Sequence, residues 1–180
     1  MTEGAPWPGE RNLHGGVDEI PLPVPTGRLW LCGKHFVAPD PDAALDSVGA
    51  DRVVSLCEEG ELAVRYPAYA AWLRSSPRAM WFPVPDLHAP PVGQVLPFLA
   101  RLRTDLGDGQ GLLMHCGAGI GRAGTLAAAL LMSFGMARYR AVAMVGLHRP
   151  MAGPEAGAQE ELLVQLAAQF ASGDASGKGP

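Results

Sequence analysis

The stretch from Met114 to Thr125 constrains the fold of this chain more than any other part of its sequence. An apolar run from Gly111 to Met114 predicts a short buried strand, which delivers His115 and Cys116 at its end. Five residues, three of them glycines, separate Cys116 from Arg122, and the Ala- and Leu-rich segment after them predicts a helix. A strand, a glycine loop and a helix start in this order form an anion site, because loop N–H groups converge and the helix N-terminus is partially positive.

The residue types in this stretch fit the chemistry of a phosphate ester. The guanidinium of Arg122 offers a fork of donors that matches two phosphate oxygens. A cation and converging dipoles also favour the thiolate form of Cys116, which would then be a nucleophile aimed at phosphorus. A plain glycine-rich turn with a buried cysteine explains the glycines and Cys116 singly, but not His115, Cys116 and Arg122 at this spacing.

The pattern His-Cys, five residues, Arg resembles the signature of the protein tyrosine phosphatase superfamily. The resemblance implies that Cys116 attacks the phosphate and forms a phosphocysteine, and that His115 tunes the cysteine and the loop geometry. It also implies a phosphate-binding loop made of Gly117, Ala118, Gly119, Ile120, Gly121 and Arg122.

A carboxylic acid is needed to protonate the leaving group and then to activate water. The best candidate is Asp86, which lies thirty residues before Cys116. The general acid of the dual-specificity branch lies at about that separation, so the chain resembles a small, atypical dual-specificity phosphatase. The alternative for Asp86 is an ordinary turn aspartate, since Pro-Asp is common in turns. His88 is a second choice for the acid.

Two further residues are expected to support the reaction. Gln159 lies in the segment where family members place a glutamine near the hydrolytic water, although an exposed glutamine in the first turn of a helix is an equally good interpretation. The residue after the signature arginine is usually Ser or Thr, whose hydroxyl assists departure of the thiolate. Here that residue is Ala123, and Thr125 lies two positions further on.

Cys57 ends a predicted strand that resembles the equivalent strand of the phosphoinositide-phosphatase branch, where such a cysteine can form a disulfide with the nucleophile. Parallel neighbouring strands would bring Cys57 close to Cys116, which makes it a possible redox partner. A simple buried thiol is the alternative. Cys32 is expected to be a packing residue.

Strands that alternate with helices predict an α/β fold with a mostly parallel central sheet of four to five strands and helices on both faces. Strands are expected at residues 29–32, 52–56, 79–84 and 111–114. Helices are expected at 42–48, 58–74 with an interruption at Pro67, from about 94 to 107, 123–134, 139–147 and from 154 onward. We expect a flexible N-terminal arm over residues 1–20, the phosphatase domain over 21–171 and a disordered tail over 172–180.

The composition limits partners and location. A formal net charge of −4 argues against a nucleic acid or an anionic membrane held by bulk electrostatics. The sequence shows no signal peptide, its longest apolar stretch is too short to span a bilayer, and its three cysteines are an odd number, so we expect a cytoplasmic monomer with free thiols. No Asp and His cluster has metal-ligand spacing, and Arg122 with the loop amides would supply the charge stabilisation, so we expect no metal and no other cofactor.

The expected function is therefore that of a phosphomonoesterase acting on phosphorylated protein or small aryl phosphate. Phosphotyrosine is the first expected substrate. The absence of long insertions indicates a shallow pocket that would also admit phosphoserine and phosphothreonine. A phosphate-binding module with little turnover is one alternative, and sulfur transfer or arsenate reduction is another. A phosphoinositide phosphatase is a third, although the uncharged residues 117–121 lack the lysines that such enzymes tend to place in the signature loop.

Overall fold

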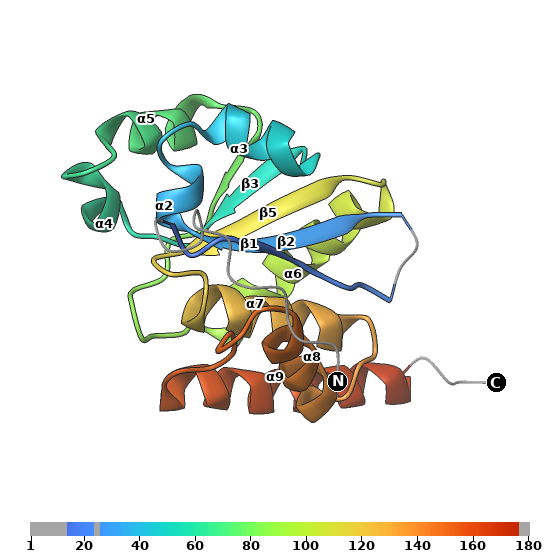
Figure 1. Ribbon diagram of the computed structural model, residues 1–180. Helices are drawn as coiled ribbons and strands as arrows, with labels where there is room; N and C mark the ends of the chain where they lie inside the picture. Colours follow the sequence, from blue (N-terminus) through green and yellow to red (C-terminus); the bar gives the residue numbers. More distant parts are fainter. Residues whose placement is uncertain (1–13, 24–25, 177–180) are drawn as a thin grey trace, which may run out of the picture.

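A five-stranded sheet forms the middle layer of the molecule in the computed structural model, which describes residues 14–23 and 26–176. Figure 1 shows this sheet between two layers of helices. The strands lie in the order β1-β2-β5-β3-β4, with β1 antiparallel to β2 and the other neighbours parallel. Their bounds are Val17–Ile20 (β1), Arg28–Gly33 (β2), Arg52–Ser55 (β3), Ala79–Trp81 (β4) and Gly111–Cys116 (β5). The predicted α/β fold with a mostly parallel sheet is confirmed.

Alternate residues of the central strands face opposite helical layers, as the pleat of a strand requires. Leu112 and Met114 of β5 belong to one apolar core, and Leu113 between them belongs to the other. The first core packs against helices α6 (Val92–Gly107), α7 (Gly121–Ser133), α8 (Arg138–His148) and α9 (Gly157–Ser176). The second packs against α2 (Lys34–Val37), α3 (Pro41–Val48), α4 (Glu59–Ala63) and α5 (Pro67–Ser75). Because β5 is buried along its whole length, its carboxyl end rigidly supports the loop that begins there.

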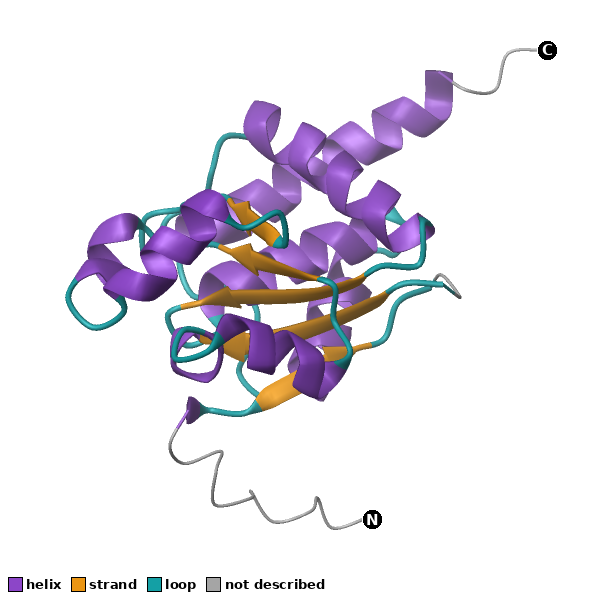
Figure 2. Cartoon of the chain, turned by 90° about the horizontal axis from the view of Figure 1, so that it is seen from above, coloured by secondary structure: helices purple, strands orange, loops and turns teal. Residues whose placement is uncertain are grey.

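The parallel strands end at one edge of the sheet. Gly33 is paired in register with Cys116, and Ser55 with His115, so β2, β3 and β5 end side by side. Figure 2, turned by a right angle from Figure 1, shows the parallel strands running side by side to this edge. Ligands of open parallel sheets bind beyond the carboxyl ends of the strands, so this edge is where a site is expected.

Both ends of the folded part differ from the prediction. Residues 17–20 fall within the expected flexible arm, but they form β1, because Ile20 is buried and the charges of Asp18 and Glu19 are paired with Arg149 and Arg28. Helix α9 continues to Ser176, so the prediction of a disordered tail is wrong for 172–176. The remainder of the predicted arm (1–13) and tail (177–180) lies outside the described residues.

The inner elements agree with the prediction, with shifted ends. The expected break at Pro67 separates α4 from α5, and Pro67 occupies the first turn of α5, where its missing N–H costs nothing. Helix α6 begins at Val92, which places Pro97 inside the helix rather than in its first turn. Helix α9 begins at Gly157 instead of Pro154, and the short α2 has no counterpart in the prediction. No helix in the described part of the chain is long and apolar enough to cross a membrane.

Candidate active site

Cys116 is the last residue of β5, and the signature loop (residues 117–122) carries the chain from it into α7. The loop lies against the end of β2: the backbone N–H of Lys34 donates to the Gly117 carbonyl oxygen at 3.0 Å. Gly119 has a φ of 74°, and a Cβ there would overlap the carbonyl group of Cys32. A glycine is therefore required at this point both by the backbone conformation and by the close approach of β2.

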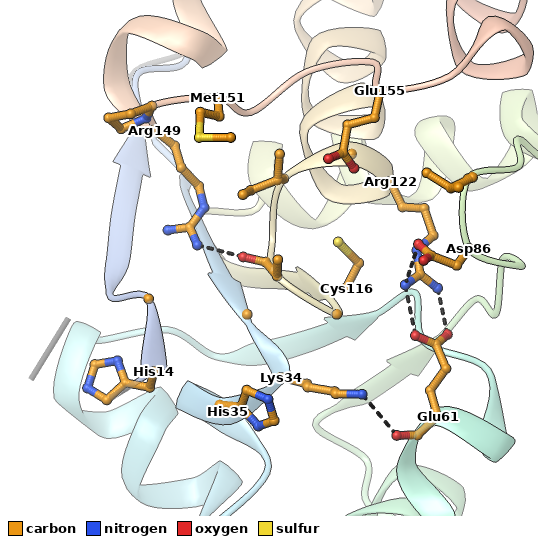
Figure 3. A pocket seen from close by; sticks show the side chains of 18 residues that line it. His14, Lys34, His35, Glu61, Asp86, Cys116, Arg122, Arg149, Met151 and Glu155 are labelled. Carbon is orange, nitrogen blue, oxygen red and sulfur yellow. Dashed lines mark hydrogen bonds and ion pairs between the residues drawn. The ribbon is translucent and has the colours of Figure 1, made fainter. Parts of the chain in front are cut away.

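The loop forms the floor of a pocket with a volume of 660 Å³ (Figure 3). Cys116 is nearly buried, with 3% of its surface exposed at the floor. Charged and polar side chains from other elements reach the same pocket: His14, Lys34, His35, Glu61, Asp86, Arg122, Arg149 and Glu155. Large apolar side chains also line it: Ile120 from the loop itself, and Leu87 and Met151 from other segments.

Arg122 is held by acceptors on three sides. Its Nη1 and Nη2 donate to the two carboxylate oxygens of Glu61 at 2.6 and 2.8 Å, and Nη1 also donates to the Val84 carbonyl oxygen at 2.8 Å. Its Nε is buried and has no hydrogen-bond partner among the described residues. A buried ionised N–H without an acceptor is costly, and an oxygen of a bound anion would satisfy it.

Glu61 supports the arginine, although no sequence pattern marks it. It lies in α4, just beyond the end of β3, and its Oε1 also accepts from the Glu58 backbone N–H at 2.9 Å. Partial burial acts to raise the pKa of Glu61, but the hydrogen bonds from Arg122 and from Glu58 outweigh it and leave the pKa below its usual range. The ionised carboxylate thus fixes the arginine in a bidentate geometry.

The structure brings Asp86 to the mouth of the pocket, as the sequence predicts. Its Oδ1 lies 3.1 Å from Arg122 Nη2, and its side chain is 69% exposed. Figure 3 shows Asp86 beside Arg122, on the side of the pocket opposite to Arg149. A carboxyl group in this place reaches the outer part of a phosphate ester held by Arg122. His88 does not line the pocket.

His115 is buried behind the loop. Its Nε2 lies 2.6 Å from the Tyr69 hydroxyl, and its Nδ1 lies 3.2 Å from the Cys116 carbonyl oxygen. Burial lowers the pKa of His115 to about 4, and burial raises the pKa of Tyr69 well above its usual range. A neutral imidazole therefore accepts from the protonated Tyr69 and donates to the Cys116 carbonyl, which orients the residue that carries the thiol.

A second buried arginine supports the loop from outside. Arg149 is 4% exposed, and its Nε and Nη2 donate to the carbonyl oxygens of Gly119 and Ala118 at 2.7 and 2.8 Å. Its Nη1 lies 2.7 Å from Asp18 of β1. No sequence pattern indicates this role, because the partners of Arg149 are backbone atoms and a residue of an unpredicted strand.

Gln159, which is predicted to lie near the hydrolytic water, is a buried residue in the structure. Its Oε1 accepts from the Thr125 hydroxyl at 3.3 Å and from the Glu155 N–H at 2.8 Å, and its Nε2 donates to the His88 carbonyl oxygen at 3.4 Å. Neither Gln159 nor Thr125 lines the pocket around Cys116. The alternative interpretation of Gln159 as an exposed helical glutamine is wrong, since the residue is 1% exposed.

Glu155, unlike Gln159, lines the pocket. A Cβ on Gly121, the first residue of α7, would overlap the Glu155 carboxylate, so this carboxylate lies directly against the start of the helix. Figure 3 shows it pointing toward the loop between Cys116 and Arg122. A signal for Glu155 is present in the sequence, since it lies in the same segment, four residues before the predicted glutamine.

The remaining cysteines are buried thiols. Cys57 lies just beyond β3, and its Sγ lies 4.0 Å from His115 Nδ1. Burial raises the pKa of Cys57 to about 12 and also raises the pKa of Cys32, which packs in the second apolar core as expected. No cluster of three or more His, Cys, Asp or Glu residues that could hold a metal ion occurs within residues 14–23 and 26–176.

A thiol, a fixed guanidinium and a carboxylate around one glycine loop define the class of cysteine-dependent phosphatases, and the comparisons with known proteins agree. A family model described as PTP-SAK, the Swiss Army Knife protein with a DSP-PTPase phosphatase domain, matches residues 31–168. The chain belongs to this family. A comparison with curated protein sequences gave no significant match.

Solved structures agree with this assignment. The structure of Tk-PTP in the active form is 30% identical, with a TM-score of 0.63 over 81% of this chain and 94% of that chain. Kinase associated phosphatase (KAP), with its catalytic cysteine replaced by serine, has a TM-score of 0.72 at 19% identity, over 87% of this chain and 96% of that chain. Human DUSP28 has a TM-score of 0.63 at 19% identity, over 81% and 94%. The predicted resemblance to small dual-specificity phosphatases is confirmed.

The buried His115 predicts how stability depends on pH. The unfolded chain protonates this imidazole near pH 6.5, whereas the folded protein does so only near pH 4. Between these values the unfolded state binds more protons, so the free energy of unfolding should fall by about 3 kcal/mol as the pH is lowered from 6.5 to 4. Denaturant unfolding at a series of pH values measures this slope. His115→Gln should remove that part of the slope, and His148→Gln, at an exposed position, should keep it. Equal slopes in all three proteins would contradict the assignment.

Proposed function

We propose that the protein is a metal-independent phosphomonoesterase that hydrolyses phosphotyrosine, and also phosphoserine and phosphothreonine, through a phosphocysteine intermediate. The observation that carries the proposal is the state of Arg122. Glu61 and Val84 hold its outer nitrogens, while its buried Nε lacks a partner among the described residues, in the same pocket as Cys116. A phosphate oxygen is the acceptor that would satisfy this atom.

The placement of the groups supports a two-step reaction. The Cys116 thiolate attacks phosphorus and forms the S–P bond, while Asp86 gives its proton to the ester oxygen as the P–O bond breaks. Arg122 and the loop N–H groups hold the equatorial oxygens. In the second step water attacks the phosphocysteine, a pocket carboxylate takes the water proton, and the S–P bond breaks to return the thiolate and release phosphate. Three carboxylates line the pocket, and since Glu61 is bound to Arg122 through both oxygens, Asp86 and Glu155 are the candidates for this base.

A phosphoinositide is the second candidate substrate. The residues of the loop carry no charge, but Lys34 lines the pocket from α2 and donates to the Glu61 carbonyl oxygen at 3.1 Å. This cation lies beside the loop rather than in it. PTPMT1, which has been solved in complex with PI(5)P, has a TM-score of 0.65 but is only 15% identical over 81% of this chain. Phosphoprotein is preferred, because one lysine outside the loop is a weaker feature than lysines within it.

The first test is hydrolysis of para-nitrophenyl phosphate in the presence of EDTA. The wild type should be active, and Cys116→Ser should be slower by about a thousandfold or more, because a serine hydroxyl is a far weaker nucleophile than a thiolate. Cys32→Ala is the matched control, since it removes another buried thiol and should retain activity. A fully reduced wild type that hydrolyses no phosphate ester would favour a phosphate-binding module. Activity that disappears only with EDTA would contradict the metal-independent mechanism.

Substitutions of Asp86 and Glu155 should differ in their effects. Asp86→Asn should lower kcat for a phosphotyrosine peptide by about 100-fold. The loss for para-nitrophenyl phosphate should be smaller, because nitrophenolate leaves without a proton. Glu155→Gln removes the other carboxylate and should slow only the second step, which appears as a burst of nitrophenol equal to the enzyme concentration in stopped-flow measurements. An equal loss of kcat for both substrates in Asp86→Asn would rule out its role as the acid.

Cys57 remains the proposed redox partner of Cys116. Peroxide would oxidise the Cys116 thiolate to the sulfenic acid, and the sulfur of Cys57 would displace water to form the disulfide. The raised pKa of Cys57 makes this second step slow, since little thiolate is present. Mass spectrometry of peroxide-treated protein should show a peptide that links the two cysteines, and in Cys57→Ala the sulfinic and sulfonic forms of Cys116 should replace it. Without any crosslinked peptide in the wild type, Cys57 is a simple buried thiol.

A further inference from the structure

Two turns at the mouth of the pocket share an unusual feature. In the turn Pro85–His88 the N–H of His88 donates to the Pro85 carbonyl oxygen at 3.1 Å, and the third residue, Leu87, has a φ of 59°. In the turn Arg149–Ala152 the N–H of Ala152 donates to the Arg149 carbonyl oxygen at 3.0 Å, and the third residue, Met151, has a φ of 70°. Within the described part of the chain, these are the two residues other than glycine with a positive φ.

Neither residue suits its backbone conformation. The third position of a turn with positive φ favours glycine or asparagine, because a Cβ there approaches the neighbouring carbonyl oxygen. Leu87 and Met151 are therefore held in an unfavourable geometry by the rest of the structure. Such residues cluster at ligand-binding sites, where the strain serves to direct a side chain.

The two side chains do not contribute to the folded core. Leu87 is 54% exposed and Met151 is 81% exposed, yet both line the pocket that contains Cys116. Figure 3 shows Met151 on one side of Cys116 and Asp86, the neighbour of Leu87, on the other. Two apolar groups therefore face the entrance from separate loops, where a glycine would have given an easier turn and no exposed apolar surface.

The loops that carry them are joined beneath the surface by one side chain. Gln159 accepts the N–H of Glu155 at 2.8 Å, and it donates to the carbonyl oxygen of His88 at 3.4 Å. His88 directly follows Leu87, and Glu155 lies four residues after Met151. One buried amide thus bonds to the residue after Leu87 and to a residue shortly beyond the second turn, which links the two loops.

We propose that Leu87 and Met151 are specificity-determining residues that contact, from two sides, the group bonded to the scissile phosphate. This inference rests on the proposed function. A phenyl ring presents two flat apolar faces to such a pair, whereas the single methylene of phosphoserine brings the polar peptide backbone between them. The pair therefore selects phosphotyrosine over phosphoserine. Contact with Leu87 also holds the ester oxygen close to Asp86, the preceding residue.

The test uses two peptides of one sequence, with phosphotyrosine or phosphoserine at the central position. Leu87→Gly and Met151→Gly remove the side chains and relieve the backbone strain, so both variants should unfold at the same temperature as the wild type or higher. Each should lower kcat/KM for the phosphotyrosine peptide about tenfold, mainly through KM, and change that for the phosphoserine peptide less than about twofold. Tyr139→Ala, at an exposed position on α8 outside the pocket, should change neither value.

Two further measurements separate this inference from the proposed function. The inhibition constant of inorganic phosphate should be the same in all variants, because phosphate carries no ring. Binding of both peptides to Cys116→Ser, with and without Leu87→Gly, measures selectivity without turnover. An unchanged ratio of phosphotyrosine to phosphoserine, with unchanged phosphate inhibition, would overturn the role of Leu87 and Met151. A different outcome is that the wild type hydrolyses neither peptide, while Cys116→Ser binds the phosphotyrosine peptide more tightly and loses this preference when Leu87→Gly is added. That result would contradict the enzyme activity and would support the role of Leu87 in selectivity.

Discussion

The conformation of the signature loop depends on hydrogen-bond donors from outside the loop that bind its carbonyl oxygens. The Lys34 N–H takes the carbonyl oxygen of Gly117, and Arg149 takes those of Ala118 and Gly119. These contacts occupy three successive carbonyl groups, and the N–H groups of a loop held in this way are available to bind an anion. The positive charge of Arg149 is balanced by Asp18. The short edge strand β1, which pairs with β2 along its whole length, is thus also part of the support of the site.

Within the pocket, charge is arranged before any substrate arrives. Breaking a buried ion pair leaves an uncompensated charge, so the Arg122–Glu61 pair is expensive to disrupt and restricts the guanidinium to one orientation. Preorganised donors of this kind need no rearrangement during the reaction, which is the main source of electrostatic catalysis. The net charge of −4 over the whole chain is compatible with phosphate recognition for this reason: the donors that matter are a few groups within one loop, and they are shielded from the remaining charges.

Features that lie close together in the chain are the ones that the sequence predicts well. The strand, loop and helix around Cys116 and Arg122 are contiguous, and their periodicity predicts the central part of the sheet. Glu61, Tyr69 and Arg149 reach the site through tertiary packing, so no local pattern marks them. Gln159 illustrates the limit: helix α9 begins at Gly157, later than Pro154, Gln159 is buried, and Glu155 lines the pocket. Sequence patterns fix a helix start only to within a few residues, so they do not decide which of two residues four positions apart reaches the pocket.

Different residues are assigned to the chemical steps and to substrate selection. The chemical steps are assigned to Cys116 and Arg122, which are nearly buried and have several partners each, and to Asp86 at the mouth of the pocket. Selection of the group that carries the phosphate is assigned to two exposed turn positions, Leu87 and Met151, whose side chains can change without loss of core packing. The two parts meet at Gln159, which accepts from the Thr125 hydroxyl of α7 and bonds to the backbone of Glu155 and His88. A change of substrate class in this fold would then require new side chains at the two turns, with the buried amide and the loop kept as they are.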